Sequence, residues 1–179
     1  MATKVITGKV RASFVHIFEP QSVNGSDPRY SCSFIILKSD AETIGKIRAA
    51  IEEAKQSGVT KWGGKIPPNL KLPLRDGDID RPDDPNYANA YFVNANSNER
   101  PGVVDRRRVP ITDPLEVYSG CYVRASLTFY PFNTNGNRGV ACGLQNIQKW
   151  CDGEPLNGRV RTEDEFDALD DVDDEDFLD

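Results

Sequence analysis

Basic and aromatic side chains alternate with small or apolar ones between Cys121 and Tyr130 of this 179-residue chain. The odd-numbered positions are apolar or small, whereas the even-numbered positions include Tyr122, Arg124 and Tyr130. A period of two is typical of a half-buried strand. A protein that binds single strands needs cations that contact phosphates and aromatic rings on which bases stack. The exposed face of this predicted strand therefore carries the chemistry for contacting a nucleic acid.

Two other groups of cations fit the same chemistry. Lys9 and Arg11 lie on the expected exposed face of an alternating segment, and three consecutive arginines form a basic cluster in a loop-like stretch. Each of these residues alone is most simply a solvated surface side chain, but together they favour binding to phosphates. The candidate DNA-contacting residues are Lys9, Arg11, Arg106, Arg107, Arg108, Tyr122, Arg124 and Tyr130.

The charge of the chain is divided unevenly. The net charge of −6 comes from 22 Lys and Arg against 28 Asp and Glu. Residues 161–179 contain eleven of the acidic residues and one of the basic residues, which leaves 17 acidic and 21 basic residues in 1–160, a net charge of +4. A basic body with an acidic end indicates a nucleic-acid-binding domain with an interaction tail. A solubilising tail on an unrelated domain is the simpler alternative.

The extreme C-terminus places an apolar pair inside an acidic run. Residues 161–179 have too few apolar side chains to form a core, so we expect them to be disordered. An aromatic ring in such a tail can dock into a hydrophobic pocket of a partner while the carboxylates meet basic residues. The same polyanion can compete with phosphates for the groove of the body. The candidate partner-binding residues are Asp173, Asp174, Glu175, Asp176, Phe177 and Leu178.

An acidic loop offers a different chemistry. Asp76, Asp78 and Asp80 alternate along the chain, but an EF-hand would need Gly and Glu where Arg81 and Tyr87 stand. Carboxylates suit magnesium, so a metal-dependent nuclease or recombination enzyme that uses these three residues is the alternative function. All the acids lie in one loop, which favours a solvated loop over a catalytic site.

Other catalytic chemistry lacks the residues it needs. His16 is the single histidine, which excludes a metal site with two. The chain has no phosphate-binding glycine loop and no G-x-S-x-G motif. We therefore expect a non-enzymatic protein without metal or cofactor. The widely spaced cysteines, which we expect to be reduced core residues, are Cys32, Cys121, Cys142 and Cys151.

Periodicity along the rest of the chain predicts few regular elements. Ile44, Ile47 and Ile51 repeat at helical spacing behind Asp40, which can cap the helix, and Gly58 can end it. In the first alternating segment, Ser13 is expected to be exposed. The residues of that segment expected to face the core are Ile6, Val10, Ala12 and Phe14. The predicted elements are strands over 4–18, 29–38, 90–96, 121–130 and 139–150, a helix over 41–56 and a hairpin turn over 133–137.

About five strands with one helix and long loops make a mainly β fold. An OB-fold, a five-stranded Greek-key barrel that binds nucleic acid through one face and its loops, fits this count, and a sandwich is the alternative. We expect residues 1–160 to form the OB-fold domain and residues 161–179 to form the tail. The chain has no apolar run of membrane-spanning length and no apolar N-terminal segment of a secretory signal, so we expect neither membrane insertion nor secretion.

Five stretches, in order along the chain, resemble one known family. The similar stretches are 30–40 (YSCSFIILKSD), 74–78 (LRDGD), 100–105 (RPGVVD), 117–125 (VYSGCYVRA) and 139–155 (GVACGLQNIQKWCDGEP). They resemble the tailed-bacteriophage family of OB-fold single-stranded DNA-binding proteins with an acidic C-terminal tail. In related tails the aromatic residue is usually last, whereas here Leu178 and Asp179 follow Phe177.

The resemblance implies a non-catalytic protein that coats single-stranded DNA during phage replication, recombination or repair. It implies a tail that recruits replication or recombination proteins, and it places the protein in the cytoplasm of the host cell. The alternatives are the nuclease and a virion or decoy protein whose acidic tail mimics DNA. The sequence leaves open whether duplex DNA is also bound.

Overall fold

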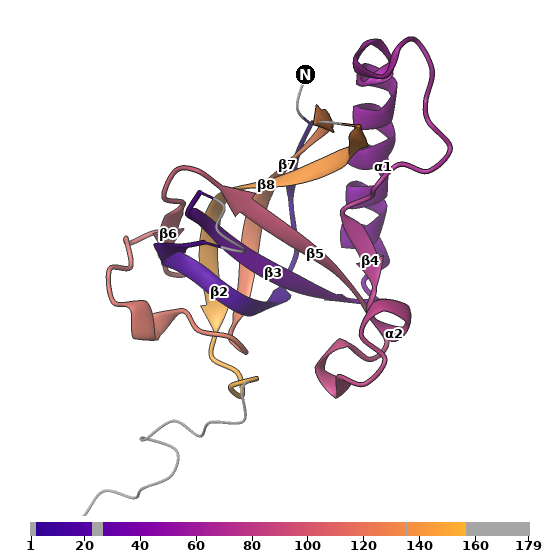
Figure 1. Cartoon of the computed structure of the whole chain (residues 1–179). Coiled ribbons are helices and arrows are strands. Elements are labelled where there is room, and N and C mark those ends of the chain that lie inside the picture. Colours follow the sequence, from indigo (N-terminus) through magenta and orange to yellow (C-terminus); the bar gives the residue numbers. More distant parts are fainter. Residues whose placement is uncertain (1–2, 23–26, 135, 157–179) are drawn as a thin grey trace, which may run out of the picture.

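The structure, a computed structural model, describes residues 3–22, 27–134 and 136–156 (Figure 1). The helices are α1 (Ala41–Ser57) and the short α2 (Gly77–Asp80), with 3-10 turns at Val59–Trp62, Pro85–Tyr87 and Pro114–Glu116. The strands of the described residues are β1 (Thr3–Ile6), β2 (Val10–Gln21), β3 (Arg29–Leu37), β4 (Leu74–Asp76), β5 (Ala90–Ser97), β6 (Gly102–Val104), β7 (Tyr122–Thr134) and β8 (Asn137–Cys151).

The five longer strands close into a barrel. β2 pairs with β3, β3 with β5, β5 with β8, β8 with β7, and β7 again with β2. Only the β5–β8 pairing among these is parallel. This closure confirms the predicted five-stranded barrel. The short strands β1, β4 and β6 extend the sheet at its edges, and three or four residues are too few for a periodic pattern to predict them.

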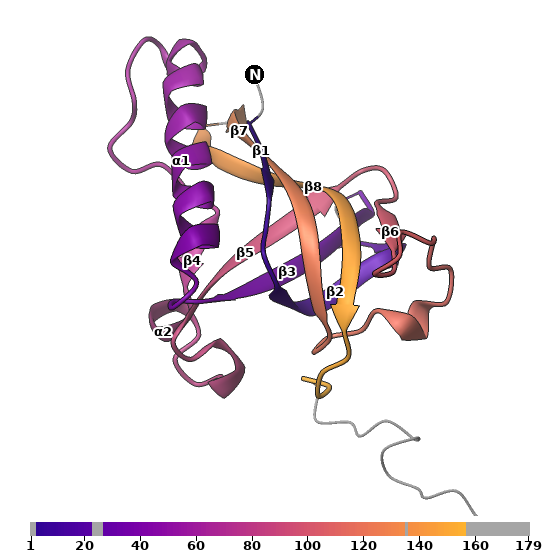
Figure 2. The same ribbon diagram turned by 180° about the vertical axis from the view of Figure 1, so that it is seen from behind.

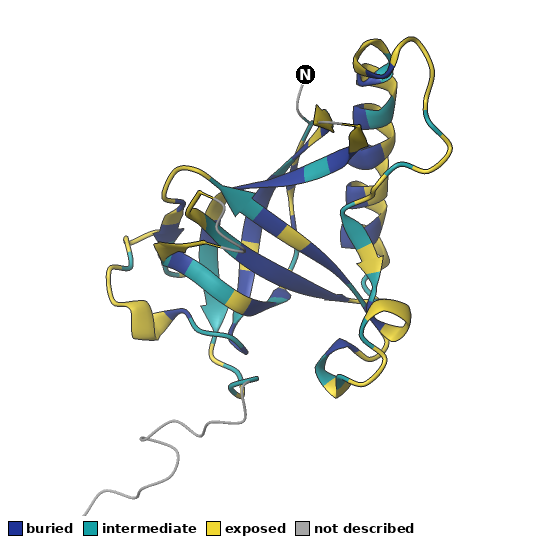
Figure 3. Ribbon diagram, viewed as in Figure 1, coloured by how far each residue is buried: buried dark blue, intermediate teal, exposed yellow. Residues whose placement is uncertain are grey.

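Helix α1 stands beside the barrel and confirms the predicted helix. The Asp40 side chain accepts a hydrogen bond from the Thr43 backbone N–H, and the helix ends at Gly58. Ile44, Ile47 and Ile51 are buried, whereas the outer face of the helix is exposed (Figure 3). Within the described residues, no helix is long and apolar enough to cross a membrane.

The barrel interior holds the hydrophobic core. Phe34, Phe129 and Leu144 are fully buried there. The three buried cysteines are free thiols, as expected, and burial raises the pKa of the Cys32 and Cys142 thiols. Cys151 is half-buried at the end of β8.

The first predicted strand is instead two strands, β1 and β2, which are separated by residues 7–9. Val10 and Ala12 face the core, but Ile6 and Phe14 are 51% and 50% exposed. Ser13, predicted to be exposed, is buried. The strand register shifts between Ser13 and His16, and Phe14 has a positive φ of 48°. A β-bulge of this kind reverses the side to which the following side chain points, which explains why strict alternation failed here.

Candidate nucleic-acid interface

The outward side of β7 carries the residues that the alternating pattern singled out. Val123, Leu127 and Phe129 are buried in the core, while Arg124 and Tyr130 are exposed and Tyr122 is half-buried. Figure 2 shows β7 with β1 and β8 on one side of the barrel. We call this side, with the loops that border it, the β7–β8 face. The predicted orientation of β7 is confirmed at these positions.

Tyr122 lies between two of the predicted cations. The Lys9 Nζ is 4.8 Å and the Arg11 Cζ 5.5 Å from the centroid of the Tyr122 ring. Both distances suit a cation–π interaction. The Arg11 guanidinium also donates to the backbone carbonyl oxygens of Gly120 (3.0 Å) and Glu154 (2.7 Å), which fixes its position. Lys9 and Arg11 therefore form one cluster with Tyr122, which lies more than 100 residues later in the chain.

Close backbone packing supports the ring of Tyr122. A Cβ atom at Gly153 would lie 2.2 Å from the Gly120 carbonyl oxygen and 2.9 Å from the Tyr122 ring. A Cβ at Gly120, whose φ is +120°, would lie 2.0 Å from the Glu154 carbonyl oxygen. Only glycine fits at these two positions, so the segment after β8 passes directly beside the cluster.

Arg106 and Arg124 meet at a hollow of about 220 Å³ that is also lined by Gln148, Lys149 and Trp150. The Arg124 Nη2 donates to the Gln148 Oε1 at 2.7 Å. The Gln148 Nε2 donates to the Arg106 carbonyl oxygen at 3.3 Å, which ties the arginine loop to the sheet. The hollow thus combines two guanidinium groups with one indole ring.

A hydrogen-bonded turn presents the three consecutive arginines. The Asp105 Oδ1 accepts hydrogen bonds from the backbone N–H groups of Arg107 (2.8 Å) and Val109 (3.0 Å). Arg108 has a φ of 68°, and the side chains of all three arginines are exposed. Only Arg106 of the three lines the hollow beside Arg124.

Tyr130 lies apart from the other candidates. It follows Tyr122 by eight residues on β7, a separation of about 26 Å along a strand. It is 37% exposed and points outward near the β7–β8 hairpin. The structure therefore brings together every candidate of the β7–β8 face except Tyr130, Arg107 and Arg108.

The six candidate cations keep their charge available. Among the described residues, the ion pairs with carboxylates are made by other cations, namely Lys38, Lys46, Lys55, Arg75 and Lys149. Gln148 and Trp150 were missed by the sequence analysis. A tryptophan at the end of the strand predicted over 139–150 was the available signal, but Arg106 and Arg124 reach the hollow from a loop and from β7.

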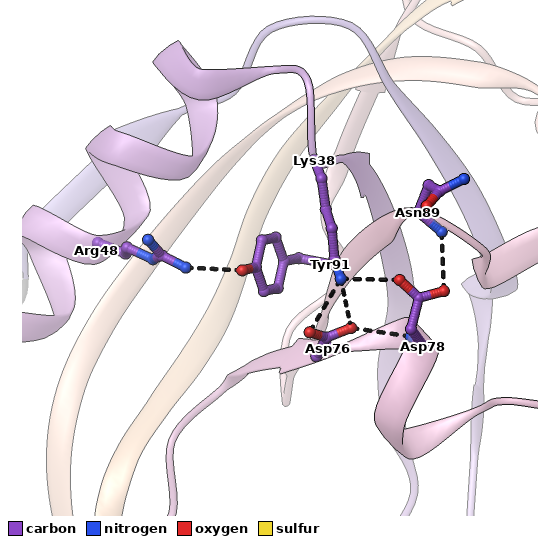
Figure 4. A network of polar contacts seen from close by, with 6 residues as sticks. All are labelled: Lys38, Arg48, Asp76, Asp78, Asn89 and Tyr91. Carbon is purple, nitrogen blue, oxygen red and sulfur yellow. Dashed lines mark hydrogen bonds and ion pairs between the residues drawn. The ribbon is translucent and has the colours of Figure 1, made fainter.

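The acidic loop expected from the sequence is instead the end of β4, which holds Asp76, and the helix α2, which holds Asp78 and Asp80. Figure 4 shows Lys38, which directly follows β3, beside Asp76 and Asp78. The Lys38 Nζ lies 3.0 Å from the Asp76 Oδ1 and 2.8 Å from the Asp78 Oδ2. Asp76 also caps α2, and the Asp78 Oδ1 accepts a hydrogen bond from the Asn89 backbone N–H. Arg75 pairs with Asp80 at 2.9 Å.

The electrostatics of this loop follow from those contacts. The hydrogen bond from Lys38 lowers the pKa of Asp78, and hydrogen bonds to Asp78 and Asp76 raise the pKa of Lys38 to about 12. The described residues contain no group of three or more His, Cys, Asp and Glu side chains that could hold a metal ion. Each carboxylate of the proposed nuclease site is already paired with a cation, so the geometry gives that alternative no support.

A second hollow is lined by residues of β4, of β5 and of the segment between these strands. β5 lies in front in Figure 1, whereas β7 lies in front in Figure 2, the view from behind. The second hollow has a volume of about 630 Å³. The Arg81 Cζ beside it is 5.0 Å from the ring centroids of Phe14 and Tyr87 and 5.9 Å from that of Phe92. The residues that line the hollow are Arg75, Asp80, Arg81, Pro82, Asp83, Asp84, Pro85, Phe92 and Asn94. We call this hollow and Phe14 the Phe14 groove.

The comparison with known proteins agrees with this fold. Residues 3–178 match the family described as the ssDNA-binding protein of Enterobacter phage Enc34. The chain belongs to this family. Protein p50 of Acyrthosiphon pisum secondary endosymbiont phage 1 is 35% identical over 187 aligned residues, which cover 98% of each chain. The resemblance to phage single-stranded DNA-binding proteins is thus confirmed.

Solved structures of phage single-stranded DNA-binding proteins have a similar fold. The single-stranded DNA-binding protein from bacteriophage Enc34, in complex with ssDNA, has a TM-score of 0.75 and 28% sequence identity; the match covers 85% of this chain and 88% of that chain. The single-stranded DNA-binding protein gp2.5 of bacteriophage T7 has a TM-score of 0.61 at 15% identity, covering 89% of this chain and 98% of that chain. The second likeness supports the fold alone.

Proposed function

We propose that this Enc34-type protein coats single-stranded DNA, without catalysis, during phage replication, recombination or repair in the host cell cytoplasm. Family membership supports the substrate class. The observation that carries the assignment of a binding surface is a group of cations around aromatic rings on the β7–β8 face. None of these cations pairs with a carboxylate of the described residues. Lys9 and Arg11 flank Tyr122, and Arg106 and Arg124 share a hollow with Trp150.

The proposed contacts divide into two kinds. The cations of the β7–β8 face neutralise backbone phosphates, which supplies affinity without regard to sequence. The rings of Tyr122, Trp150 and Tyr130 offer surfaces on which bases stack. Stacking does not depend on the base sequence, because every base has a π-face. Such a surface binds exposed bases, so we expect duplex DNA to bind more weakly than a single strand.

A salt titration tests this function. Binding of the full chain to a labelled single strand and to a duplex of equal length is measured by fluorescence anisotropy. If about four phosphates are neutralised, the plot of log K against log salt concentration has a slope near −3 for the single strand. Affinity that does not depend on salt would contradict the electrostatic contacts. Added magnesium should leave the labelled strand intact, whereas degradation would indicate a nuclease.

The acidic tail is the proposed protein-binding segment. Its candidate residues, 173–178, and the expected boundary between residues 160 and 161 lie outside the described residues. The described chain ends at Leu156, whose backbone N–H donates to the Ser119 carbonyl oxygen at 3.0 Å. Since the Glu154 carbonyl oxygen accepts a hydrogen bond from Arg11, the last described residues lie directly beside the Tyr122 cluster. This position supports the proposal that the acidic residues further along the chain compete with phosphates there.

Capture of a replication or recombination protein depends, in this proposal, on the aromatic residue of the tail. Replacement of Phe177 by Ala removes the apolar side chain that would enter a pocket of the partner, and it leaves the acidic charge in place. A purified phage or host replication protein should be retained on a column that carries the immobilised wild-type chain. It should flow through a column that carries the Phe177→Ala chain. Retention by both would contradict docking through Phe177.

A further inference from the structure

The Phe14 groove contains an aromatic side chain in an unfavourable position. Phe14 is 50% exposed, and its φ of 48° is in the left-handed region, which a bulky side chain rarely adopts. Strict alternation with Ala12 would have buried this ring in the barrel. The bulge between Ser13 and His16 turns it outward instead, as bulges beside functional sites commonly do.

The surroundings fix the ring in that outward position. The Arg81 Cζ lies 5.0 Å from the Phe14 centroid, so the guanidinium group covers one side of the ring. Arg81 is itself placed over Tyr87 and Phe92, whose rings pack edge to face at 5.0 Å. The Tyr87 hydroxyl donates to the buried Ser13 Oγ at 3.0 Å, next to the bulge. The bulge, the arginine and the buried rings thus form one rigid support for Phe14.

The excess of carboxylates in the groove favours an uncharged ligand over an anionic one. Asp80, Asp83 and Asp84 line it against two guanidinium groups, and one of these, Arg75, is already paired with Asp80. A phosphate group would meet an excess of carboxylates, as would the acidic tail. A nucleobase is uncharged and stacks on an aromatic face, and its N–H groups can donate hydrogen bonds to carboxylate oxygens. The exposed Asn94 amide adds a donor and an acceptor for a base edge.

We propose that Phe14 is a base-stacking position for single-stranded DNA, with the base in the groove and its phosphates outside it. This inference rests on the proposed function and adds a second contact region. Phe14 follows Arg11 by three residues, which places their Cα atoms no more than about 11 Å apart. A strand whose phosphates bind the cations around Tyr122 therefore reaches the Phe14 groove within a few nucleotides. Arg81 is a positioning residue for this ring.

The test compares Phe14→Ala with the wild-type chain on a labelled oligothymidylate. Loss of one stacked base lowers affinity about 5- to 150-fold. The salt slope stays at the wild-type value, because no phosphate contact is removed. Phe14→Trp keeps a stacking ring and should retain affinity. Ile79→Ala is the matched control, since Ile79 is 74% exposed on neighbouring α2 and does not line the groove.

Photocrosslinking locates the contact independently of any variant. An oligonucleotide with 5-iododeoxyuridine is irradiated with the wild-type chain, and the crosslinked peptide is identified by mass spectrometry. A crosslink at Phe14 is expected. If the wild-type chain binds DNA but Phe14→Ala binds equally well and the crosslink lies elsewhere, the inference is wrong and the proposed function stands. If the wild-type chain does not bind single-stranded DNA, both fail.

Discussion

The two sides of the barrel differ in their charge and in their exposed aromatic rings. The β7–β8 face presents six cations that make no ion pair with a described carboxylate. The Phe14 groove, by contrast, has more carboxylates than cations around an exposed ring and a buried aromatic cluster. In our proposal, phosphates bind the first surface, and bases stack at both. The comparison shows that the two sides differ in their balance of cations and carboxylates.

The two surfaces meet at the segment that follows β8. Arg11 holds the Glu154 carbonyl oxygen on one side, and Leu156 lines a hollow of about 140 Å³ with Phe14 and Tyr87 on the other. The last described residues therefore lie between the surface proposed for phosphates and the surface proposed for a base. Variants on either side should differ in salt dependence as well as in affinity.

The largest effect is expected from removing the arginine turn. Replacing Arg106, Arg107 and Arg108 together by Ser should lower the magnitude of the salt slope by about 2 and the affinity at 50 mM salt on the order of 100-fold. Anisotropy titrations at several salt concentrations measure both. Lys46→Ser is the control, because Lys46 is paired with Glu42 on α1. An unchanged slope would remove the turn from the phosphate-binding surface.

Stacking on β7 should contribute the next largest effect. Tyr122→Ala and Tyr130→Ala are each expected to weaken binding by about 1–3 kcal/mol with little change in melting temperature. Arg124→Ala should instead weaken binding mainly by reducing the salt slope by about 0.7. Because the two tyrosines are about 26 Å apart along the strand, an effect at Tyr122 alone would confine the DNA to the end of β7 near Arg11.

Deletion of the tail tests competition at the β7–β8 face. Removing residues 161–179 should tighten binding at low salt, since a tethered polyanion has an effective concentration on the order of millimolar. The gain should shrink as salt screens the tail. Phe177→Ala should leave DNA affinity unchanged because its charge is unchanged. A truncated chain that binds DNA no better than the full chain at low salt would contradict the competition.

The smallest effect concerns the stability of the acidic loop. The pKa of Asp78 is lowered in the fold, so its pairing with Lys38 stabilises the protein above the ordinary carboxyl pKa near 4 and is lost as the pH falls below it. The pKa of Lys38 is raised to about 12, so its contribution is complete below its ordinary value of 10.5 and is lost as the pH rises through 12. Asp78→Asn should lower the melting temperature slightly at pH 7, and the difference should shrink as the pH falls below about 4.

The same variant separates structure from function. Asp78→Asn should bind single-stranded DNA as the wild-type chain does, because Asp78 belongs neither to the β7–β8 face nor to the lining of the Phe14 groove. Its melting curves at pH 7, 4 and 3 are compared with those of the wild type. A difference in melting temperature that persists unchanged at pH 3 would show that the ion pair is not its cause.

Local sequence patterns were sufficient to predict the regular parts of this protein. The outward position of Arg124 follows from strand alternation, and helix α1 follows from its apolar repeat, its Asp40 cap and Gly58. The hairpin between β7 and β8 follows from the turn residues, and the ordered family stretches pointed to the phage single-stranded DNA-binding proteins. These features depend on residues close together in the chain, so periodicity and turn chemistry are sufficient to predict them.

The features that join distant segments depend on how the whole chain folds. The bulge that exposes Phe14 breaks the alternation from which its burial was predicted, and Arg81 reaches that ring from 67 positions later in the chain. Lys38 pairs with Asp76 and Asp78 because β3 and the loop before β5 lie side by side. Barrel closure sets these contacts, and a local pattern carries no information about which surface residues closure will bring together.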